Sequence, residues 1–414
     1  MKDEILARIN NPPQLEMMYR ANKVAFKRSF GLLYPELKGN AIADCWNERL
    51  NYESNEINWG TGRELLFVIM ASLVAGIIAK LPAILQLDEE FFYSRNIGFI
   101  VFPMLTAFFA WKNNLSAGKI YFIVGTTLAG LIFINLLPDD QKSDTLVLSG
   151  IYMLLFLWSI LGFAFVNDQR NNVEKRLSFL SYNGDLIVMT TLIVIAGGIL
   201  SGVTIGLFSL IGFKIEKFYS ENIIVFALPA APILGTYLTR SNPQLVGKVS
   251  PVIAKIFSPL VLVMLVIYLI AIIYSGKDPY NDREFLMIFN GLLIGVMAII
   301  FFSVAESSKK TVNQVEIWII FLLSVVTIIV GGIALSAILY RIFTLGITPN
   351  RAAVLGTNVL IFINLLLVTA QLFRVVSKKS DISGVGKVIS FYLPVYCIWT
   401  VIVTFIFPLL FGFK

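Results

Sequence analysis

The sequence predicts an all-α fold: a polytopic helical membrane protein with about 11 transmembrane helices and a small helical cytosolic module at its N-terminus. Of the 414 residues, 57% are hydrophobic and only 14% are charged, and the mean hydropathy is +0.79. Soluble domains are usually 45–50% apolar and about 25% charged. The composition therefore excludes a soluble enzyme, a disordered tail and a nucleic-acid-binding domain.

Histidine and several sequence motifs that enzymes commonly use are missing from the sequence. Histidine, the commonest general base and metal ligand, does not occur at all. The sequence also contains no phosphate-binding loop, dinucleotide glycine fingerprint, zinc-ligand spacing or nucleophile elbow. We therefore expect no catalytic residue, no metal and no cofactor, and an enzyme is the least favoured class.

The first element is a polar module, residues 1–63, which we expect on the cytosolic side. Residues 14–30 are basic and roughly amphipathic, and Ile42, Trp46 and Leu50 recur at the spacing of a second short helix over residues 41–50. Residues 51–60 are predicted to be a polar tether. Two interpretations stay open: a helical cap on the membrane domain, or a docking site for a cytosolic protein partner or for anionic lipid headgroups.

Residues 64–414 form the second predicted domain, in which eleven segments are long and apolar enough to cross a bilayer. A hydrocarbon core about 30 Å thick needs roughly 20 residues of helix. One segment is interrupted by Lys80, and the shortest contains Pro103. In chain order the segments are residues 65–87, 96–111, 120–138, 145–167, 186–213, 222–239, 256–276, 285–305, 317–340, 352–373 and 388–413.

The distribution of Lys and Arg predicts the orientation of these spans. With the N-terminus inside, the cytoplasmic segments hold more than two thirds of the 33 basic residues, as the positive-inside rule requires. This orientation places the C-terminus outside. The formal net charge of +7 then reflects loops that face anionic lipid, and we expect membrane lipids rather than nucleic acid as partners.

Two features stand out in the first six spans besides their hydrophobicity. Lys80 is the one cation inside a span, and it either extends to the interface along its aliphatic stem or contacts an anion or a lipid headgroup. Pro229 and Pro232 lie near the middle of the sixth span, where they predict a kinked or broken helix. Transporters use such breaks to expose the ends of half-helices to substrate.

The fifth span contains Gly198, Gly202 and Gly206 at four-residue intervals. Such a ridge of small residues permits the close approach of a neighbouring helix. We expect this ridge to serve helix packing.

The tenth span carries a stripe of polar side chains. Thr357, Asn364 and Gln371 recur every seven residues and so share one helical face, with Asn358 beside them. Because polar groups are costly in hydrocarbon, the stripe must meet another helix or water. Hydrogen bonding between helices is the commoner use, and a polar translocation path is the functional alternative.

The loop between the ninth and tenth spans, residues 340–351, predicts the end of one helix, a glycine turn and the start of the next. Thr348 has the position of an N-cap and Pro349 that of the first helical residue. Arg341 and Arg351 flank this turn on the predicted outer side, against the positive-inside trend. They would either pair with acids of the 139–144 loop or bind headgroup phosphates or another anionic ligand.

This loop, with the glycine-rich fifth span and the apolar helices around it, resembles a family of bacterial multi-pass membrane proteins catalogued as domain of unknown function 4153. The similarity extends over roughly residues 65–414. It implies a helical bundle in the bacterial inner membrane and implies no activity or cofactor. The matching residues are Arg341, Gly346, Thr348, Asn350 and Arg351.

Two functions remain in competition at this level. The first is a permease-like protein that moves a small solute or lipid, using Pro229, Pro232 and the stripe of the tenth span. The second is a non-transporting envelope scaffold that recruits a partner through residues 1–63. The sequence identifies neither a solute nor a partner, and it leaves the oligomeric state open.

Overall fold

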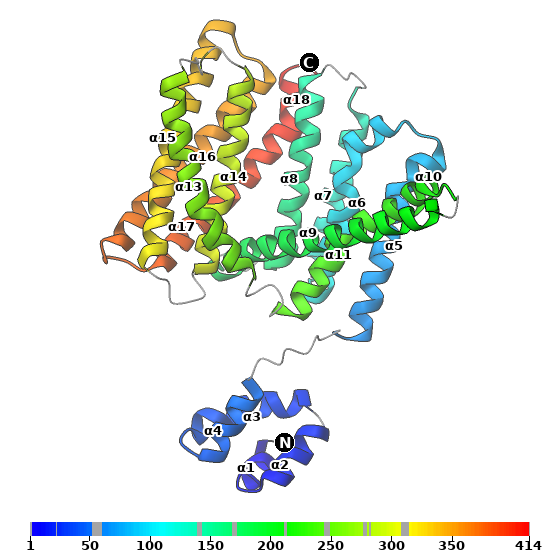
Figure 1. The fold of residues 1–414 in the computed structure, drawn as a ribbon, viewed down its shortest axis with the longest axis vertical. Coiled ribbons are helices and arrows are strands. Elements are labelled where there is room, and N and C mark those ends of the chain that lie inside the picture. Colours follow the sequence, from blue (N-terminus) through cyan, green and yellow to red (C-terminus); the bar gives the residue numbers. More distant parts are fainter. Residues whose placement is uncertain are drawn as a thin grey trace. The chain divides into compact units, whose positions relative to one another are not determined.

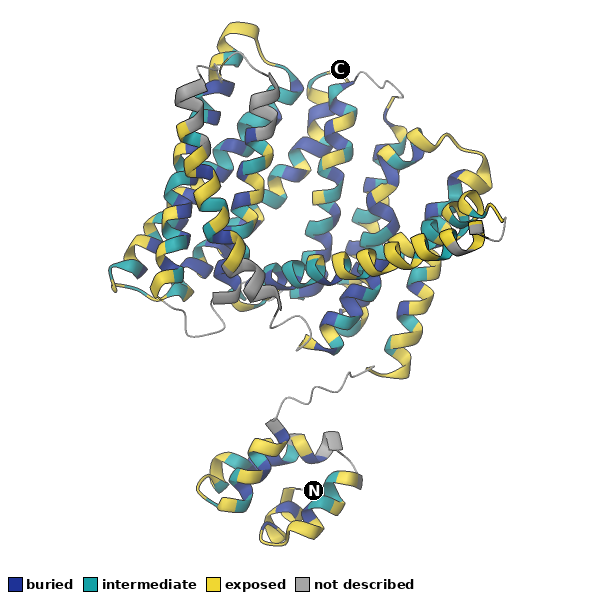
Figure 2. Ribbon diagram, viewed as in Figure 1, coloured by how far each residue is buried: buried dark blue, intermediate teal, exposed yellow. Residues whose placement is uncertain are grey.

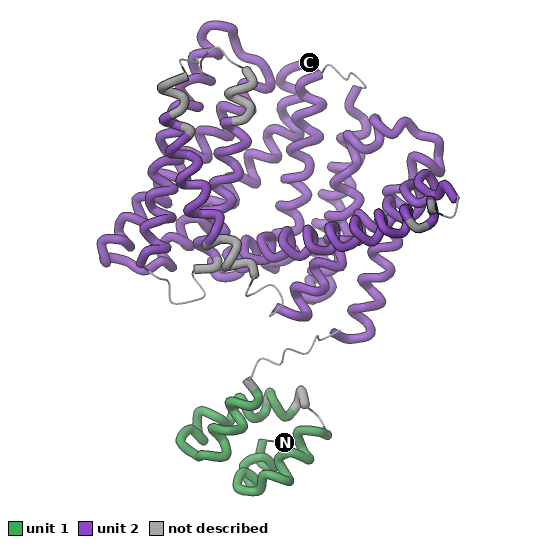
Figure 3. The backbone as a smooth tube through the Cα atoms, in the orientation of Figure 1, with its two compact units in different colours: residues 1–58 green, residues 59–414 purple. Residues whose placement is uncertain are grey.

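The computed structural model confirms the all-α fold, because every regular element in the described part of the chain is a helix. The chain divides into two compact units, Met1–Asn58 and Trp59–Lys414 (Figure 3), close to the boundary expected at residue 63. The structure describes residues 2–21, 23–51, 60–138, 143–167, 172–210, 213–243, 249–275, 280, 283–307 and 314–413.

The first unit consists of four short helices around one apolar core (Figure 1). They are α1 (Lys2–Ala7), α2 (Pro12–Ala21), α3 (Lys23–Leu37) and α4 (Ala41–Asn51). The single helix expected over residues 14–30 is therefore two helices. A straight helix would hold Leu15 and Phe26 about 16 Å apart along its axis. In the two separate helices both side chains enter the same core.

Aromatic side chains from three helices meet in this core. Tyr19 of α2, Phe26 of α3 and Trp46 of α4 contact one another, with ring centroids 5.3–5.8 Å apart. Asn40 caps α4, because its side-chain oxygen accepts hydrogen bonds from the backbone N–H groups of Ile42 and Ala43. The short helix expected at residues 41–50 is thus confirmed, while most of the expected tether, residues 52–59, lies outside the described residues.

Glu16 connects two helices of the first unit and makes the stability of that unit depend on pH. The Arg20 side chain donates a hydrogen bond of 2.8 Å to the Glu16 carboxylate, and Arg49 of α4 lies 2.9 Å from its other oxygen. The hydrogen bond from Arg20, together with Arg49, holds the pKa of Glu16 below its ordinary value. A lowered pKa in the folded state stabilises the unit above the ordinary carboxyl pKa, and that stabilisation is lost as the pH falls through the folded-state pKa.

We therefore predict that hydrogen exchange of residues 2–51 in the full chain speeds up as the pH is lowered below about 4.5, after correction for intrinsic exchange. Glu16→Gln should remove part of this acid sensitivity, because the glutamine has no proton to gain. An unchanged pH dependence in Glu16→Gln would show that Glu16 contributes nothing to it.

The second unit contains all the long helices (Figure 1). They are α5 (Gly62–Leu85), α6 (Glu89–Lys112), α7 (Ala117–Leu136), α8 (Asp144–Val166), α9 (Val173–Leu210), α10 (Glu216–Tyr219), the π-helix η1 (Ser220–Ile224), α11 (Val225–Ser241), α13 (Val249–Ser275), α14 (Arg283–Ser307), α15 (Gln314–Leu345), α16 (Pro349–Val376), α17 (Ile382–Val401), the π-helix η2 (Ile402–Ile406) and α18 (Phe407–Leu410).

Among the described residues, nine helices are long and apolar enough to cross a membrane. They coincide with nine of the eleven expected spans. The remaining two spans fall on α13 and α14, whose described apolar stretches, Ile256–Ile267 and Phe289–Ala305, are shorter. The structure thus supports a multi-pass membrane fold, and the count of eleven stays a prediction.

The shortest expected span, residues 96–111, is longer in the structure. Helix α6 begins at Glu89, with Asp88 as its N-cap, and its 24 residues extend over roughly 36 Å, enough to cross a bilayer. The charge-free run in the sequence begins only after Arg95, so the expected span started at residue 96. This arginine is nevertheless buried and bonded inside the protein. Helix α6 therefore continues through this charged residue, because another part of the protein accepts its hydrogen bonds.

Helix α9 differs from the other long helices in direction and in packing. Figure 1 shows it running past α8 toward α10, beside α11. Figure 2 shows its second half as mostly exposed. In the described part of the chain, no atom lies within 4 Å of a Cβ placed on Gly198, Gly202 or Gly206. The expectation that this ridge packs against a neighbouring helix of the chain is therefore wrong.

The second unit has two main apolar cores. The first is built mainly from α5, α6, α7 and α8, with residues of α9 and α11. The second is built from α13, α14, α15, α16 and α17. Helix α8 contacts α16 and α17, and Phe405 of η2 packs against the first core, so α17 and η2 lead from one core to the other.

Candidate functional site

The polar stripe expected on the tenth span lies on α16, and three of its members contact the α17 side. Thr357 accepts a 2.9 Å hydrogen bond from the indole N–H of Trp399 in α17. Its hydroxyl also lies 2.6 Å from the hydroxyl of Tyr152 in α8. Thr357 therefore joins helices that belong to the two different cores.

Asn364 and Gln371 extend this row along α16. The Asn364 amide, fully buried, donates a 3.0 Å hydrogen bond to the hydroxyl of Tyr396 in α17. The Gln371 amide donates at 2.9 Å to Ser380, in the loop before α17. We call Thr357, Asn364 and Gln371 the α16 polar line.

Asn358 does not belong to this line. Its amide donates a 2.8 Å hydrogen bond to the side-chain oxygen of Asn290 in α14. Asn358 directly follows Thr357, so two consecutive residues of α16 bond in different directions, Asn358 to α14 and Thr357 to α17. Each of the four candidates makes a contact between elements, which is what helix–helix hydrogen bonding predicts.

Hydrogen bonding along α16 and α17 is nevertheless incomplete. Within the described residues, four buried oxygens on α16, α17 and η2 have no hydrogen-bond partner: Asn364 Oδ1, Thr369 Oγ1, Ser390 Oγ and Thr404 Oγ1. Buried polar atoms in proteins are nearly always paired, with protein groups or with water. Several unpaired oxygens on two adjoining helices therefore indicate a place for water or for a polar solute.

The irregular turn η2 interrupts α17 beside this region. It spans Ile402–Ile406 and contains Thr404, whose backbone carbonyl accepts a 2.9 Å hydrogen bond from the Ser149 hydroxyl of α8. π-Turns in α-helices are frequent at functional sites. The second such turn, η1 at Ser220–Ile224, directly precedes α11.

The helix break expected at Pro229 and Pro232 is not present, because α11 runs continuously from Val225 to Ser241 through both prolines. A proline ring opposes the carbonyl four residues earlier. For Pro229 that residue is Val225, which follows directly on the wide π-turn η1. The irregularity lies before the prolines, so they do not expose half-helix ends.

Lys80 is bonded inside the protein, since its ammonium group donates to the side-chain oxygen of Asn222 in η1. The contact ties α5 to the π-turn. The two interpretations of Lys80, an aliphatic stem that extends to the interface and a contact with an anion or a lipid headgroup, both stay predictions. The lysine joins two helices.

The two arginines that flank the turn between α15 and α16, Arg341 near the end of α15 and Arg351 in the first turn of α16, have different surroundings. Arg351 donates hydrogen bonds of 2.8 and 2.7 Å to the carbonyl oxygens of Leu345 and Gly346, so it closes the turn after α15. Arg341 makes no hydrogen bond or ion pair with any residue that the structure describes. Neither arginine pairs with the described Asp144, and Asp139 and Asp140 lie outside the described residues.

The restart of the chain after this turn is confirmed. Thr348 is the N-cap of α16 and accepts a hydrogen bond from the backbone N–H of Arg351, and Pro349 is the first helical residue. Arg351 thus has a structural role: its backbone N–H contributes to the start of α16, and its side chain closes the preceding turn.

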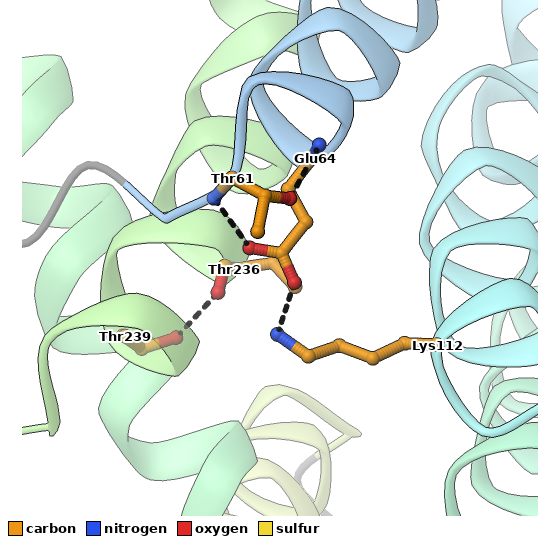
Figure 4. A network of polar contacts seen from close by, with 5 residues as sticks. All are labelled: Thr61, Glu64, Lys112, Thr236 and Thr239. Carbon is orange, nitrogen blue, oxygen red and sulfur yellow. Dashed lines mark hydrogen bonds and ion pairs between the residues drawn. The ribbon is translucent and has the colours of Figure 1, made fainter. Parts of the chain in front are cut away.

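A second polar cluster joins the start of α5 to the end of α6, beside two threonines of α11 (Figure 4). Thr61 and Glu64 form a reciprocal capping box at the start of α5, and Glu64 also forms a 3.1 Å ion pair with Lys112 at the end of α6. On α11, the Thr239 hydroxyl donates to the Thr236 carbonyl. A cavity of about 760 Å³ adjoins Glu64 and Lys112.

Several residues of these sites were not predicted from the sequence. Tyr152, Tyr396 and Trp399 are ordinary aromatic members of apolar spans, and only the tertiary fold brings them to α16. Arg95, in contrast, could have been found, because it is the only charged residue between Glu90 and Lys112. It was missed because the expected span began after it.

The fold and these sites define a multi-pass integral membrane protein with polar groups buried between its helices. Neither models of known protein families, nor curated proteins, nor solved structures give a match to this chain. Among the described residues, no group of three or more Cys, Asp or Glu side chains is placed to hold a metal ion.

Proposed function

We propose that this protein is a permease-like protein that moves a small polar solute or lipid through the membrane along the α16 polar line. The observation that carries the proposal is the set of four unpaired buried oxygens on α16, α17 and η2. Helices that serve only as packing elements would satisfy such groups internally, since each unpaired one costs about 1–3 kcal/mol.

The arrangement of the cores supports this function. The line lies where α17 passes from the second core to α8 of the first, and Thr357 contacts both α8 and α17. Relative movement of two separately packed bodies is the usual basis of alternating access. Movement at this boundary would break and remake contacts such as Tyr152–Thr357.

One end of this boundary is closed in the structure. Leu148 of α8, Ala353 of α16, Val403 of η2 and Phe407 of α18 form a buried apolar cluster at the end where α8 and α16 begin. The polar line starts one helical turn beyond Ala353. A permease that is open to one side of the membrane must be closed at the other side. The apolar cluster would provide such a closed end next to the polar line.

Reconstitution tests this function even though the solute is not identified. Liposomes containing the protein are incubated with a mixed extract of small metabolites, and their contents are identified by mass spectrometry. We expect at least one metabolite to enter faster than into protein-free liposomes, and Asn364→Leu to reduce that entry about tenfold, because it removes a buried polar group from the line.

Ile363→Val is the matched control for this experiment, because Ile363 is the exposed, apolar neighbour of Asn364 on the same helix. It should leave entry unchanged. Entry no faster than into empty liposomes for every metabolite, or equal entry in Asn364→Leu, would contradict the permease function.

A second candidate function is supported by the first unit. Its helices enclose their own core, while Leu6, Met17 and Leu32 stay exposed on its surface. This combination fits a separate module that recruits a cytosolic protein to the membrane. A chain lacking residues 1–58 should then lose its cellular function while still inserting, whereas normal function of the truncated chain would exclude the scaffold.

We further propose a bacterial inner-membrane location with the N-terminus in the cytoplasm and the C-terminus outside, on the distribution of Lys and Arg and on the resemblance to the family noted above. Cys45 in the first unit is exposed and free. In a Cys397→Ala background, a membrane-impermeant maleimide should label Cys45 only after the cells are permeabilised. Labelling of intact cells would contradict this orientation.

A further inference from the structure

A separate cavity lies between the first half of α6 and the start of α8, away from the α16 polar line. Its volume is about 310 Å³, and its lining includes Asp88, Glu90, Arg95, Ile97, Ile151 and Leu154. The cavity therefore combines two carboxylates, one guanidinium group and an apolar wall.

Arg95 lines this cavity, and its guanidinium group is held in one orientation. The side chain is only 2% exposed, and its charged end lies 3.9 Å from the centre of the Phe91 ring. It also donates hydrogen bonds to the carbonyl oxygens of Leu137 and Pro138 at the end of α7, at 3.4 and 3.2 Å. A planar guanidinium held in one orientation is well suited to a phosphate group.

The carboxylates make the cavity unlike a simple anion site. Asp88 caps α6 by accepting a 2.7 Å hydrogen bond from the backbone N–H of Phe91, and Glu90 lies in the first turn of the helix. Both line the same cavity as Arg95. Two acids would repel a ligand that carried only negative charge, whereas a primary ammonium group beside the phosphate would complement them.

The remaining wall is apolar and open to the side. Ile97 of α6 and Val147 and Ile151 of α8 line the cavity, and each is more than half exposed. These helices cross the membrane, so the exposed side chains face hydrocarbon. Gly150 keeps α6 and α8 close together here, because a Cβ at that position would lie 2.9 Å from the Ser94 carbonyl oxygen.

We propose that this cavity binds a group in which a phosphate is linked to a primary ammonium, as in the headgroup of an ethanolamine phospholipid. Arg95 holds the phosphate, Asp88 and Glu90 hold the ammonium, and the acyl chains lie along Ile97 and Ile151. The lipid belongs to the leaflet that meets the loop between α5 and α6. This site is independent of the proposed permease function.

Native mass spectrometry of the full-length protein with added phosphatidylethanolamine or phosphatidylglycerol tests the site. We expect phosphatidylethanolamine to bind about tenfold more tightly than phosphatidylglycerol. Glu90→Gln, which removes one charge and keeps the shape, should abolish most of this preference. Equal or tighter binding of phosphatidylglycerol to the wild type, or an unchanged preference in Glu90→Gln, would overturn the proposal.

A second experiment fills the cavity with a larger side chain. Ile151→Trp should reduce phosphatidylethanolamine binding about tenfold, and Ile97→Trp fills the same space from α6 in case the first variant does not fold. Leu155→Trp is the matched control, since Leu155 is also exposed on α8 but does not line the cavity. Binding that is unaffected by either filling variant would likewise overturn the proposal.

Soluble phosphoethanolamine distinguishes the two sources of this headgroup. Displacement of the bound lipid by millimolar phosphoethanolamine would show that the headgroup alone is recognised, so that a soluble zwitterion also occupies the site. Retention of the lipid would show that the apolar wall is needed and that the ligand is a membrane lipid. Both results support the charge pattern assigned to the cavity.

Discussion

Replacing Gly356 with alanine should destabilise the protein by about 1–3 kcal/mol, because the new methyl group has no space. A Cβ at Gly356 would lie 2.1 Å from Cζ2 and 2.2 Å from Cη2 of the Trp399 ring. The ring cannot move away without losing its hydrogen bond to Thr357. The substitution therefore separates α16 from α17 at the start of the polar line.

The measurement is the thermal unfolding of the detergent-solubilised chain, followed by tryptophan fluorescence. Gly125→Ala in α7 is the control, since no atom lies within 4 Å of a Cβ at that position. Alanine there should be neutral or slightly stabilising, because it is the better helix former. Equal stability of the two variants would show that α16 and α17 do not approach as closely as described.

Replacing Asn96 with leucine should cost about 1–3 kcal/mol, because it removes two hydrogen bonds between helices and leaves the half-buried Asn135 amide with only its bond to the Leu131 carbonyl. Asn96 of α6 and Asn135 of α7 exchange two hydrogen bonds, of 3.0 and 2.8 Å, and Asn96 is buried. The variant Asn96→Leu removes both bonds and keeps Asn135 inside the protein.

The double variant Asn96→Leu/Asn135→Leu should regain most of the lost stability, because two apolar side chains in place of a bonded amide pair leave no unpaired group. Unfolding of the two single variants and the double variant in the same detergent gives the coupling energy. Additive losses in the double variant would show that the two amides act independently.

The membrane fold could be predicted because it depends on the length and apolarity of segments, which are local properties. Every expected span coincides with a helix, and Thr348 and Pro349 begin α16 as expected. The start of α6 could not be predicted in this way. The Arg95 side chain donates hydrogen bonds to the carbonyl groups of Leu137 and Pro138, which directly follow α7 and are distant from Arg95 in sequence.

The sequence did not reveal which residues of other helices contact the polar residues of α16. The seven-residue spacing of Thr357, Asn364 and Gln371 predicted a shared face, and all three do contact α17 or the loop before it. Nothing in that spacing indicates Tyr152 or Tyr396, since any of the 15 tyrosines could have been the neighbour.

The expected packing of the glycine ridge and the expected break at two prolines are not found, because a local pattern permits a structure without requiring it. Gly198, Gly202 and Gly206 allow close packing, yet no neighbouring helix of the described chain lies against them. Pro229 and Pro232 remove backbone donors, yet α11 continues through both, with the irregular turn η1 placed before them. Both outcomes depend on how α9, η1 and α11 are arranged in space.

Thiol labelling at Asn364 is the most direct test of the proposed path, since a path must contain water and lipid-facing positions must not. Cysteine replaces Asn364 or its lipid-facing neighbour Ile363 in a Cys45→Ser/Cys397→Ala background, in sealed vesicles of known orientation. Maleimides react with the thiolate, which forms in water and not in hydrocarbon. A membrane-impermeant maleimide should label Asn364→Cys from at least one side and leave Ile363→Cys unlabelled. If Asn364→Cys stays as unreactive as Ile363→Cys from both sides, solutes do not cross the membrane along α16.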